Sequence, residues 1–464
     1  MFGNPGIEAL LLVTHLFLNI AANTPPQGEV QVNRAQHLLQ QGQLLEAEKL
    51  CQMMLGQHPR DGEVMLLLGR VRFATAERLE RAHRPRGELL AAYRFARTTL
   101  HHAEALGVRS GIGSLYHAVG YCYYMEGAYE KAILSFSRAL EAGVTAPSIR
   151  ILRGICYSRL NRLEAAREDL SAAVELLPQD YHAHMEYAEV LARQGRTANA
   201  RQVLWSFYRQ SSDPLDAPGR YRILYRIFLH ALHDNDVEAA LAPMLEAEKV
   251  FPENPKVHLE LGALYYRKGQ LEPADAEFLK SLSGSTSLDK PSHARALYHR
   301  GLIAHHQGDH HRALKLFDES RVLSPTHAPT LQQLGTTLRR LGQHERAQQV
   351  LDRFRQVVAV ENEIQRLRKL TLNQPRNGGA RGQLIQALLK LKRLDEASQE
   401  LQDFRNYRPD EGSVQQLENL IREAQQKQRI QNKAGEKSSS AGRLFNLPPL
   451  SLLLFLNHFQ LPGV

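Results

Sequence analysis

Histidine is the residue type in this chain best suited to do chemistry. The 464 residues include 21 histidines, and His305, His306, His310 and His311 flank one predicted turn. A zinc site needs three or four such ligands that converge on one point. The two pairs lie on consecutive predicted helices, which permits convergence without requiring it. We interpret them, together with His299, as solvated histidines near helix ends, so the sequence predicts no metal site and no cofactor.

The three cysteines offer little chemistry. Cys122 and Cys156 occupy equivalent places on apolar helix faces, and neither they nor Cys51 form a CxxC motif. A disulfide framework is therefore not indicated. We expect buried, reduced thiols that pack as small hydrophobic side chains.

Motifs of common enzyme classes are missing from the sequence. It contains no GxxxxGK[ST], no HExxH, no GxSxG and no GxGxxG that follows a strand. These motifs carry phosphate-binding, zinc-hydrolase, serine-hydrolase and dinucleotide-binding chemistry. We therefore predict that the chain is not an enzyme.

A fixed spacing of small residues runs through most of the chain. A glycine or alanine is followed by an alanine twelve positions later, and three adjoining units of 34 residues begin at Gly113, Pro147 and Tyr181. Such a period indicates stacked helix-turn-helix units. The pairs are Ala35–Ala47, Gly120–Ala132, Gly154–Ala166, Ala188–Ala200, Gly262–Ala274, Gly301–Ala313 and Gly335–Ala347.

The physical logic of one unit is visible in residues 113–146. Two segments with apolar residues at helical spacing are separated by Gly127, which is free to take the positive φ that ends a helix. Gly120 and Ala132 are small because the two helices must approach closely, and Phe136 fills the space beside them.

These units resemble the tetratricopeptide repeat family. The best matches are "YHAVGYCYYMEGAYEKAILSFSRAL" from Tyr116, "LELGALYYRKGQLEPADAEFLKSL" from Leu259 and "LYHRGLIAHHQGDHHRALKLFDES" from Leu297. The resemblance implies an all-α fold, a right-handed superhelical solenoid of helix-turn-helix repeats with a concave groove that binds a partner segment. The implied repeats are 28–61, 62–112, 113–146, 147–180, 181–214, 221–254, 255–288, 294–327, 328–361 and 378–411.

Several segments depart from the regular repeat. Unit 62–112 is irregular, and we expect residues 78–89 to form an inserted, longer turn. Residues 362–374 keep apolar residues at helical spacing and should extend the second helix of unit 328–361. Residues 412–431 have one apolar face, which suits a helix that caps the stack.

The two ends of the chain are more apolar. The segment 1–27 contains an apolar stretch, 7–22, with no preceding basic residue, so it is either a defective signal or anchor or a hydrophobic helix. Residues 432–464 combine a polar linker with an apolar tail broken by prolines. We expect a cytoplasmic protein; the alternative is export or membrane association through residues 7–22, with membrane contact by either end.

The positions at the ends of the first helices suggest how a partner is bound. Most of them are basic or histidine, and aromatic residues lie on the same helices, which suits recognition of a protein or peptide segment of acidic or amphipathic character. A cation there also stabilises the helix dipole, which is the alternative explanation. The candidate partner-binding residues are Tyr121, Tyr124, Arg159, Met185, Arg193, Tyr266, Arg267, Tyr298, His306 and Arg340.

The charge of the chain leads to the same class of function. The net charge is +9, but the 58 basic residues are mixed with 49 acidic ones throughout, which argues against a nucleic-acid partner. We predict a non-catalytic protein–protein interaction scaffold. The alternatives are an exported or membrane-tethered assembly factor of a cell envelope or secretion system, and the targeting subunit of an enzyme complex.

Overall fold

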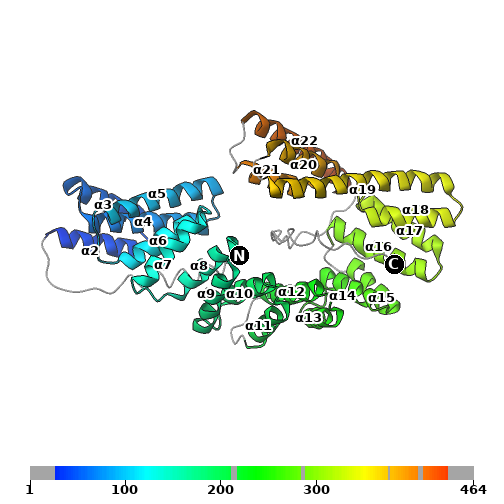
Figure 1. Ribbon diagram of the computed structural model, residues 1–464, viewed down its shortest axis with the longest axis horizontal. Helices are drawn as coiled ribbons and strands as arrows, with labels where there is room; N and C mark the ends of the chain where they lie inside the picture. The colour runs from blue at the N-terminus through cyan, green and yellow to red at the C-terminus, as the bar shows by residue number, and fades with distance from the viewer. Residues whose placement is uncertain (1–26, 211–216, 284–287, 375–376, 406–410, 437–464) are drawn as a thin grey trace. The chain divides into compact units, whose positions relative to one another are not determined.

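The computed structural model describes residues 27–210, 217–283, 288–374, 377–405 and 411–436, and all regular structure in these ranges is α-helical (Figure 1). Most helices form consecutive pairs. They are α2 (Gln27–Gln40), α3 (Leu44–Gln57), α4 (Gly62–Arg81), α5 (Arg86–Ala105), α6 (Ile112–Met125), α7 (Tyr129–Glu141), α8 (Pro147–Arg159), α9 (Leu163–Leu176), α10 (Tyr181–Arg193), α11 (Thr197–Gln210), α12 (Ala217–His233), α13 (Val237–Val250), α14 (Pro255–Arg267), α15 (Leu271–Ser283), α16 (Lys290–His306), α17 (His310–Leu323), α18 (Ala328–Arg340), α19 (His344–Asn373), α20 (Gly378–Lys390), α21 (Leu394–Arg405) and α22 (Glu411–Glu436).

The packing divides the chain into two compact units, Met1–Ala247 and Glu248–Val464. Within each unit a helix packs mainly on its neighbours in the chain. First helices of successive pairs also touch, as α6 does with α8 and α14 does with α16. The core of each unit is therefore a series of local clusters, as expected for stacked repeats.

A close contact between the two helices of a pair recurs sixteen residues apart. A Cβ atom added to Gly262 would lie 2.7 Å from ring atoms of Phe278, and one added to Gly301 would lie 2.5 Å from the Phe317 ring. Real Cβ atoms do not approach other atoms so closely, so only glycine fits there. The same contact joins Gly120 to Phe136, Gly154 to Leu170 and Gly335 to Leu351. The predicted role of Gly120 and Phe136 is confirmed.

The turn inside each pair has one residue in the left-handed region. Gly127 has a φ of 74°, as predicted, and equivalent turns use Asn161 (φ 60°) and Lys392 (φ 59°). Asparagine tolerates this conformation better than most side chains, whereas lysine is strained in it.

The prediction of an inserted turn at residues 78–89 is wrong. Helix α4 continues to Arg81 and α5 begins at Arg86, so the additional residues lengthen both helices to 20 residues. Leu79 and Leu89–Leu90 stand among arginine, alanine and glutamate, which are good helix formers. The turn itself is short, with His83 at a φ of 51°.

The C-terminal part of the second unit contains a long helix. Helix α19 runs for 30 residues, so the predicted extension beyond residue 361 is confirmed. Its second half buries Ile364 and Leu367 against α20. Helix α22 packs on α20 and α21 through Leu417 and Ile421. The apolar stretch 7–22 and the tail 437–464 lie outside the described residues.

The contact between Gly262 and Phe278 gives a test with a built-in rescue. Gly262→Ala should lower the melting temperature, because overpacking costs about 1–3 kcal/mol and exceeds the roughly 1 kcal/mol gained in helix propensity. The double variant Gly262→Ala/Phe278→Leu reproduces the natural pair Ala188 and Leu204, both fully buried. It should recover at least about 1 kcal/mol relative to the sum of the single changes.

Thermal melts of the two single variants, the double variant and the parent, followed by circular dichroism, measure this coupling. Phe278→Leu alone should also be destabilising, because it leaves a cavity. If the destabilisation of the double variant equals the sum of those of Gly262→Ala and Phe278→Leu, the two side chains do not compete for the same space.

Candidate functional site

Aromatic side chains of α14 and α16 meet in the second unit. The Tyr266 hydroxyl lies 3.2 Å from Nε2 of His306. The rings of Tyr266 and Tyr298 each pack edge-on against His299, with centroid distances of 5.5 and 5.3 Å. Both tyrosines are half-buried, and burial raises the pKa of Tyr298 to about 12. The structure thus brings three predicted residues, Tyr266, Tyr298 and His306, together around His299 in one aromatic cluster.

Exposed cations stand at the ends of helices in the same unit. Arg267 is the last residue of α14 and Arg340 is the last residue of α18, and both side chains are exposed. His306 ends α16 in the same way and is also exposed.

In the first unit, an arginine lies between a tyrosine and a glutamate. Arg159 is the last residue of α8 and is exposed. Burial raises the pKa of both Tyr124 and Glu186, and the positive charge of Arg159 opposes this rise in each. Burial raises the pKa of Tyr124 to about 12, so its phenol stays neutral. The charge of Arg159 is thus felt by both Tyr124 and Glu186.

Three other candidates belong to the interior or to contacts within the protein. Tyr121 is only 6% exposed and packs on Phe73 and Tyr93, so its expected place on a binding surface is wrong. Met185 packs against the core of α10 and α11. Arg193 donates hydrogen bonds to the carbonyl and hydroxyl oxygens of Ser158, at 2.8 and 2.7 Å, and so stabilises the preceding repeat.

A buried carboxyl group lies near Tyr121. Glu77 on α4 is 3% exposed, and its Oε1 atom has no hydrogen-bond partner. Its Oε2 atom is 3.6 Å from Nη2 of Arg81. Burial raises the pKa of Glu77 to about 7 despite this cation. Neighbouring Glu80 instead accepts hydrogen bonds from the hydroxyls of Tyr93 and Tyr121.

The histidines at the predicted turn do not all behave as expected. His306 and His311 are exposed, but His305 and His310 are half-buried with ring centroids 4.9 Å apart. His299 is not solvated: it stacks on Phe278 at 5.2 Å, and burial lowers its pKa to about 3. Aromatic packing thus accounts for His299, a reason that helical spacing alone did not reveal.

The thiols are buried and reduced, as predicted for the three cysteines. Burial raises the pKa of Cys51 to about 11 and that of Cys156 to about 12. A thiolate is therefore disfavoured, and these side chains are poor nucleophiles.

One polar group was missed from the sequence. Among the described residues, Glu248, His258 and Glu277 form the one group of three potential metal ligands. A recurring spacing in the sequence could have indicated this group: a polar residue on the first helix of a pair contacts a carboxylate nineteen residues later on the second helix. The pairs with this spacing are His258 and Glu277, Arg150 and Asp169, and Arg381 and Glu400. In the other repeats this pair is less polar.

The raised pKa of Glu77 predicts a pH-dependent stability. Between the usual pKa of the unfolded carboxyl, near 4.5, and the folded value of about 7, the unfolded chain binds fewer protons, so stability falls as pH rises. Glu77→Gln removes this loss and should be stabilising by on the order of 2–3 kcal/mol above about pH 7.

Melting temperatures of Glu77→Gln and of the parent, measured from about pH 5 to pH 8, test this prediction. The gap should widen with pH, whereas Glu175→Gln, a change at an exposed carboxyl, should show no such trend. A gap that stays constant would mean that Glu77 is ionised in the folded protein throughout this range.

Comparison with known proteins supports the fold described above. Two models of the tetratricopeptide repeat family match the chain, at residues 152–213 and 292–356. The first stretch covers part of α8 and all of α9–α11, and the second covers most of α16, all of α17 and α18 and the beginning of α19. They carry the recurring contacts Gly154–Leu170 and Gly301–Phe317. No functionally curated protein matches the chain.

Solved structures of similar proteins cover about half of the chain. PilF of Pseudomonas aeruginosa is 20% identical (TM-score 0.34) over 47% of this chain and 95% of that protein. The type IV pilus biogenesis factor PilW is 20% identical (TM-score 0.35), covering 50% and 100%. The C-terminal part of a repeat-containing protein of Cytophaga hutchinsonii is 18% identical (TM-score 0.39), covering 57% and 98%.

At these identities and TM-scores, the likeness to solved structures carries no functional information. The assignment depends instead on the two family matches and on the paired helices with a glycine held against a large side chain sixteen residues later. This chain contains tetratricopeptide repeats.

Proposed function

We propose that the protein is a non-catalytic interaction scaffold that binds a segment of a partner protein along its first helices. The observation that carries this proposal is the aromatic cluster of Tyr266, Tyr298 and His306 in the same unit as the exposed cations Arg267 and Arg340. Half-buried rings offer apolar area at low entropic cost, and nearby cations offer directional hydrogen bonds.

The chemistry of these residues favours an acidic or amphipathic partner segment. An arginine can bind a carboxylate with both of its donor groups and can also stack on aromatic rings. Neutral tyrosines accept the apolar side of such a segment. The pair Tyr124 and Arg159 provides the same combination in the first unit.

A non-catalytic role agrees with the chemistry of the described residues. The buried thiols are held protonated, and the histidines around α16 are engaged in ring packing. In the described part of the chain, no helix is both long and apolar enough to cross a bilayer. Membrane association through residues 7–22 or through the C-terminal end stays a separate hypothesis.

The cation hypothesis can be tested against helix capping on the same variants. Arg267→Ala/Arg340→Ala should weaken binding of a partner segment by roughly tenfold, if each arginine contributes about 0.5–1 kcal/mol. The affinity should also fall as salt is raised, because exposed charges are screened. A partner captured from its native source and reduced to a synthetic peptide provides the ligand for fluorescence anisotropy.

Arg193→Ala is the matched control, because its guanidinium is hydrogen-bonded to Ser158 within the protein. It should lower the melting temperature by a few degrees and leave the affinity of the second unit for its peptide unchanged. If the double variant binds as tightly as the parent while melting at a lower temperature, these arginines only cap helices and the proposal fails.

A further inference from the structure

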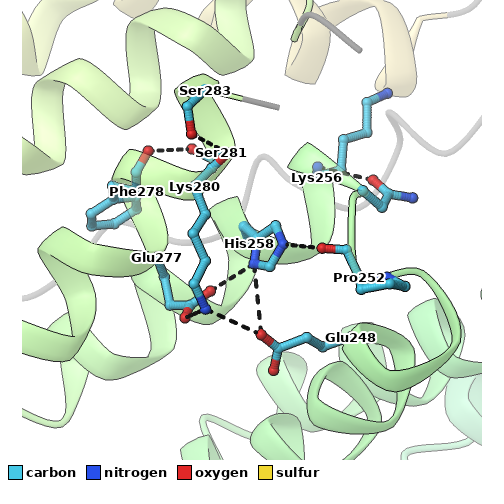
Figure 2. A network of polar contacts seen from close by, with 10 residues as sticks. Glu248, Pro252, Lys256, His258, Glu277, Phe278, Lys280, Ser281 and Ser283 are labelled. Carbon is cyan, nitrogen blue, oxygen red and sulfur yellow. Dashed lines mark hydrogen bonds and ion pairs between the residues drawn. The ribbon is translucent and has the colours of Figure 1, made fainter. Parts of the chain in front are cut away.

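Three side chains with metal-ligating atoms converge in the second unit. Glu248 lies near the end of α13, His258 in the first turn of α14 and Glu277 in the middle of α15. One ligand atom from each falls within 4.8 Å of the others. Figure 2 shows the His258 ring directed toward both carboxylates.

The second ring nitrogen of His258 is held by the backbone. Its Nε2 atom lies 2.7 Å from the carbonyl oxygen of Pro252, which can only accept, so Nε2 carries a proton. The Nδ1 atom faces Glu277 and Glu248, and in the metal-free protein a proton lies in its 2.7 Å hydrogen bond to Glu277. A bound ion would replace this proton at the Nδ1 lone pair. Metal-binding histidines in proteins are commonly oriented by such a hydrogen bond to a carbonyl.

The distances fit a small divalent ion after minor adjustment. The Nδ1 atom of His258 is 2.7 Å from Oε2 of Glu277 and 3.9 Å from Oε1 of Glu248. Bonds of about 2.0–2.1 Å in a tetrahedral site place neighbouring ligand atoms roughly 3.3 Å apart. The two distances lie on either side of this value, so each needs to change by about half an ångström.

The repeat differs from its equivalents in a way that suits a metal. In the repeat that contains Arg150, two arginines contact one carboxylate, because Arg150 and Arg153 both face Asp169. Here histidine takes the place of arginine, and Glu248 adds a second carboxylate. With a neutral imidazole, the two carboxylates carry a charge of −2, which one divalent cation offsets.

A lysine occupies part of this position in the absence of metal. The ammonium of Lys280 lies 2.7 Å from Glu277 and 3.5 Å from Glu248. Its side chain is 52% exposed and can move into solvent. Glu248 is 30% exposed, which leaves a route of entry for an ion and room for water as a fourth ligand.

We propose that Glu248, His258 and Glu277 bind a divalent transition-metal ion of the zinc class. For the ion to enter, Lys280 must leave its contacts with the two carboxylates. Imidazole and carboxylate together suit such ions better than Ca²⁺ or Mg²⁺, which prefer oxygen ligands alone. The bound ion links the end of α13 to α14 and α15. This site is separate from the aromatic and cationic residues of the partner-binding proposal.

Titration of the full-length, chelator-treated chain with Co²⁺ gives a direct readout. We expect visible absorption of a low-coordinate nitrogen–oxygen site that saturates at one equivalent and is displaced by Zn²⁺. Lys280→Met should bind roughly fivefold more tightly, because the competing cation is gone. Glu248→Gln should weaken binding by at least about tenfold, because it removes one of three protein ligands.

His258→Gln should abolish the saturable absorption, with circular dichroism used to verify that the variant remains folded. If it does not fold, Lys280→Met and Glu248→Gln decide, since both changes are at partly exposed side chains. His305→Gln/His310→Gln is the matched control and should bind Co²⁺ as the parent does. The proposal is overturned if the parent shows no saturable site, or if Glu248→Gln and Lys280→Met both leave the affinity unchanged while the control reduces it.

Discussion

The structure depends on one repeated contact between the two helices of a pair. A residue without a side chain on the first helix lies against a large apolar side chain sixteen residues later, as Gly262 does against Phe278. The contact fixes how closely the helices approach, and close packing tolerates little error there. Where alanine replaces glycine at Ala35 or Ala188, the opposing residue is Cys51 or Leu204, so the space is shared differently but remains filled.

Polar groups are placed around this apolar contact and give individual repeats their character. The interhelical position four residues before the glycine is Arg150 in one repeat and His258 in another, and each faces a carboxylate of the second helix. The end of the first helix, by contrast, carries exposed cations such as Arg267 and Arg340. The groups that join the two helices and the cations that we propose to bind a partner thus occupy different positions of the same 34-residue pattern.

The fold could be predicted from the sequence because the small residues and the turn residues recur in register. The side-chain clusters that depend on contacts between helices could not be predicted from the sequence. Tyr121 looked like a surface aromatic because helical spacing places it beside Tyr124, yet it packs under Phe73 and Tyr93 of the preceding helices. His258 and Glu277 do not form a recognisable short sequence motif, because they are nineteen residues apart. The third residue of the group, Glu248, lies on another helix.

Hydrogen exchange of a Gly120→Leu variant tests most directly the claim that each helix pair is held by its own contact. Leucine at this position would clash with Phe136, which lies 2.7 Å from an added Cβ atom. The account predicts that amide protection falls in α6 and α7 and in their neighbours α5 and α8, while α18 to α21 keep the protection of the parent. A loss of protection throughout the chain would contradict it, because stability would then be shared by the whole molecule rather than by neighbouring repeats.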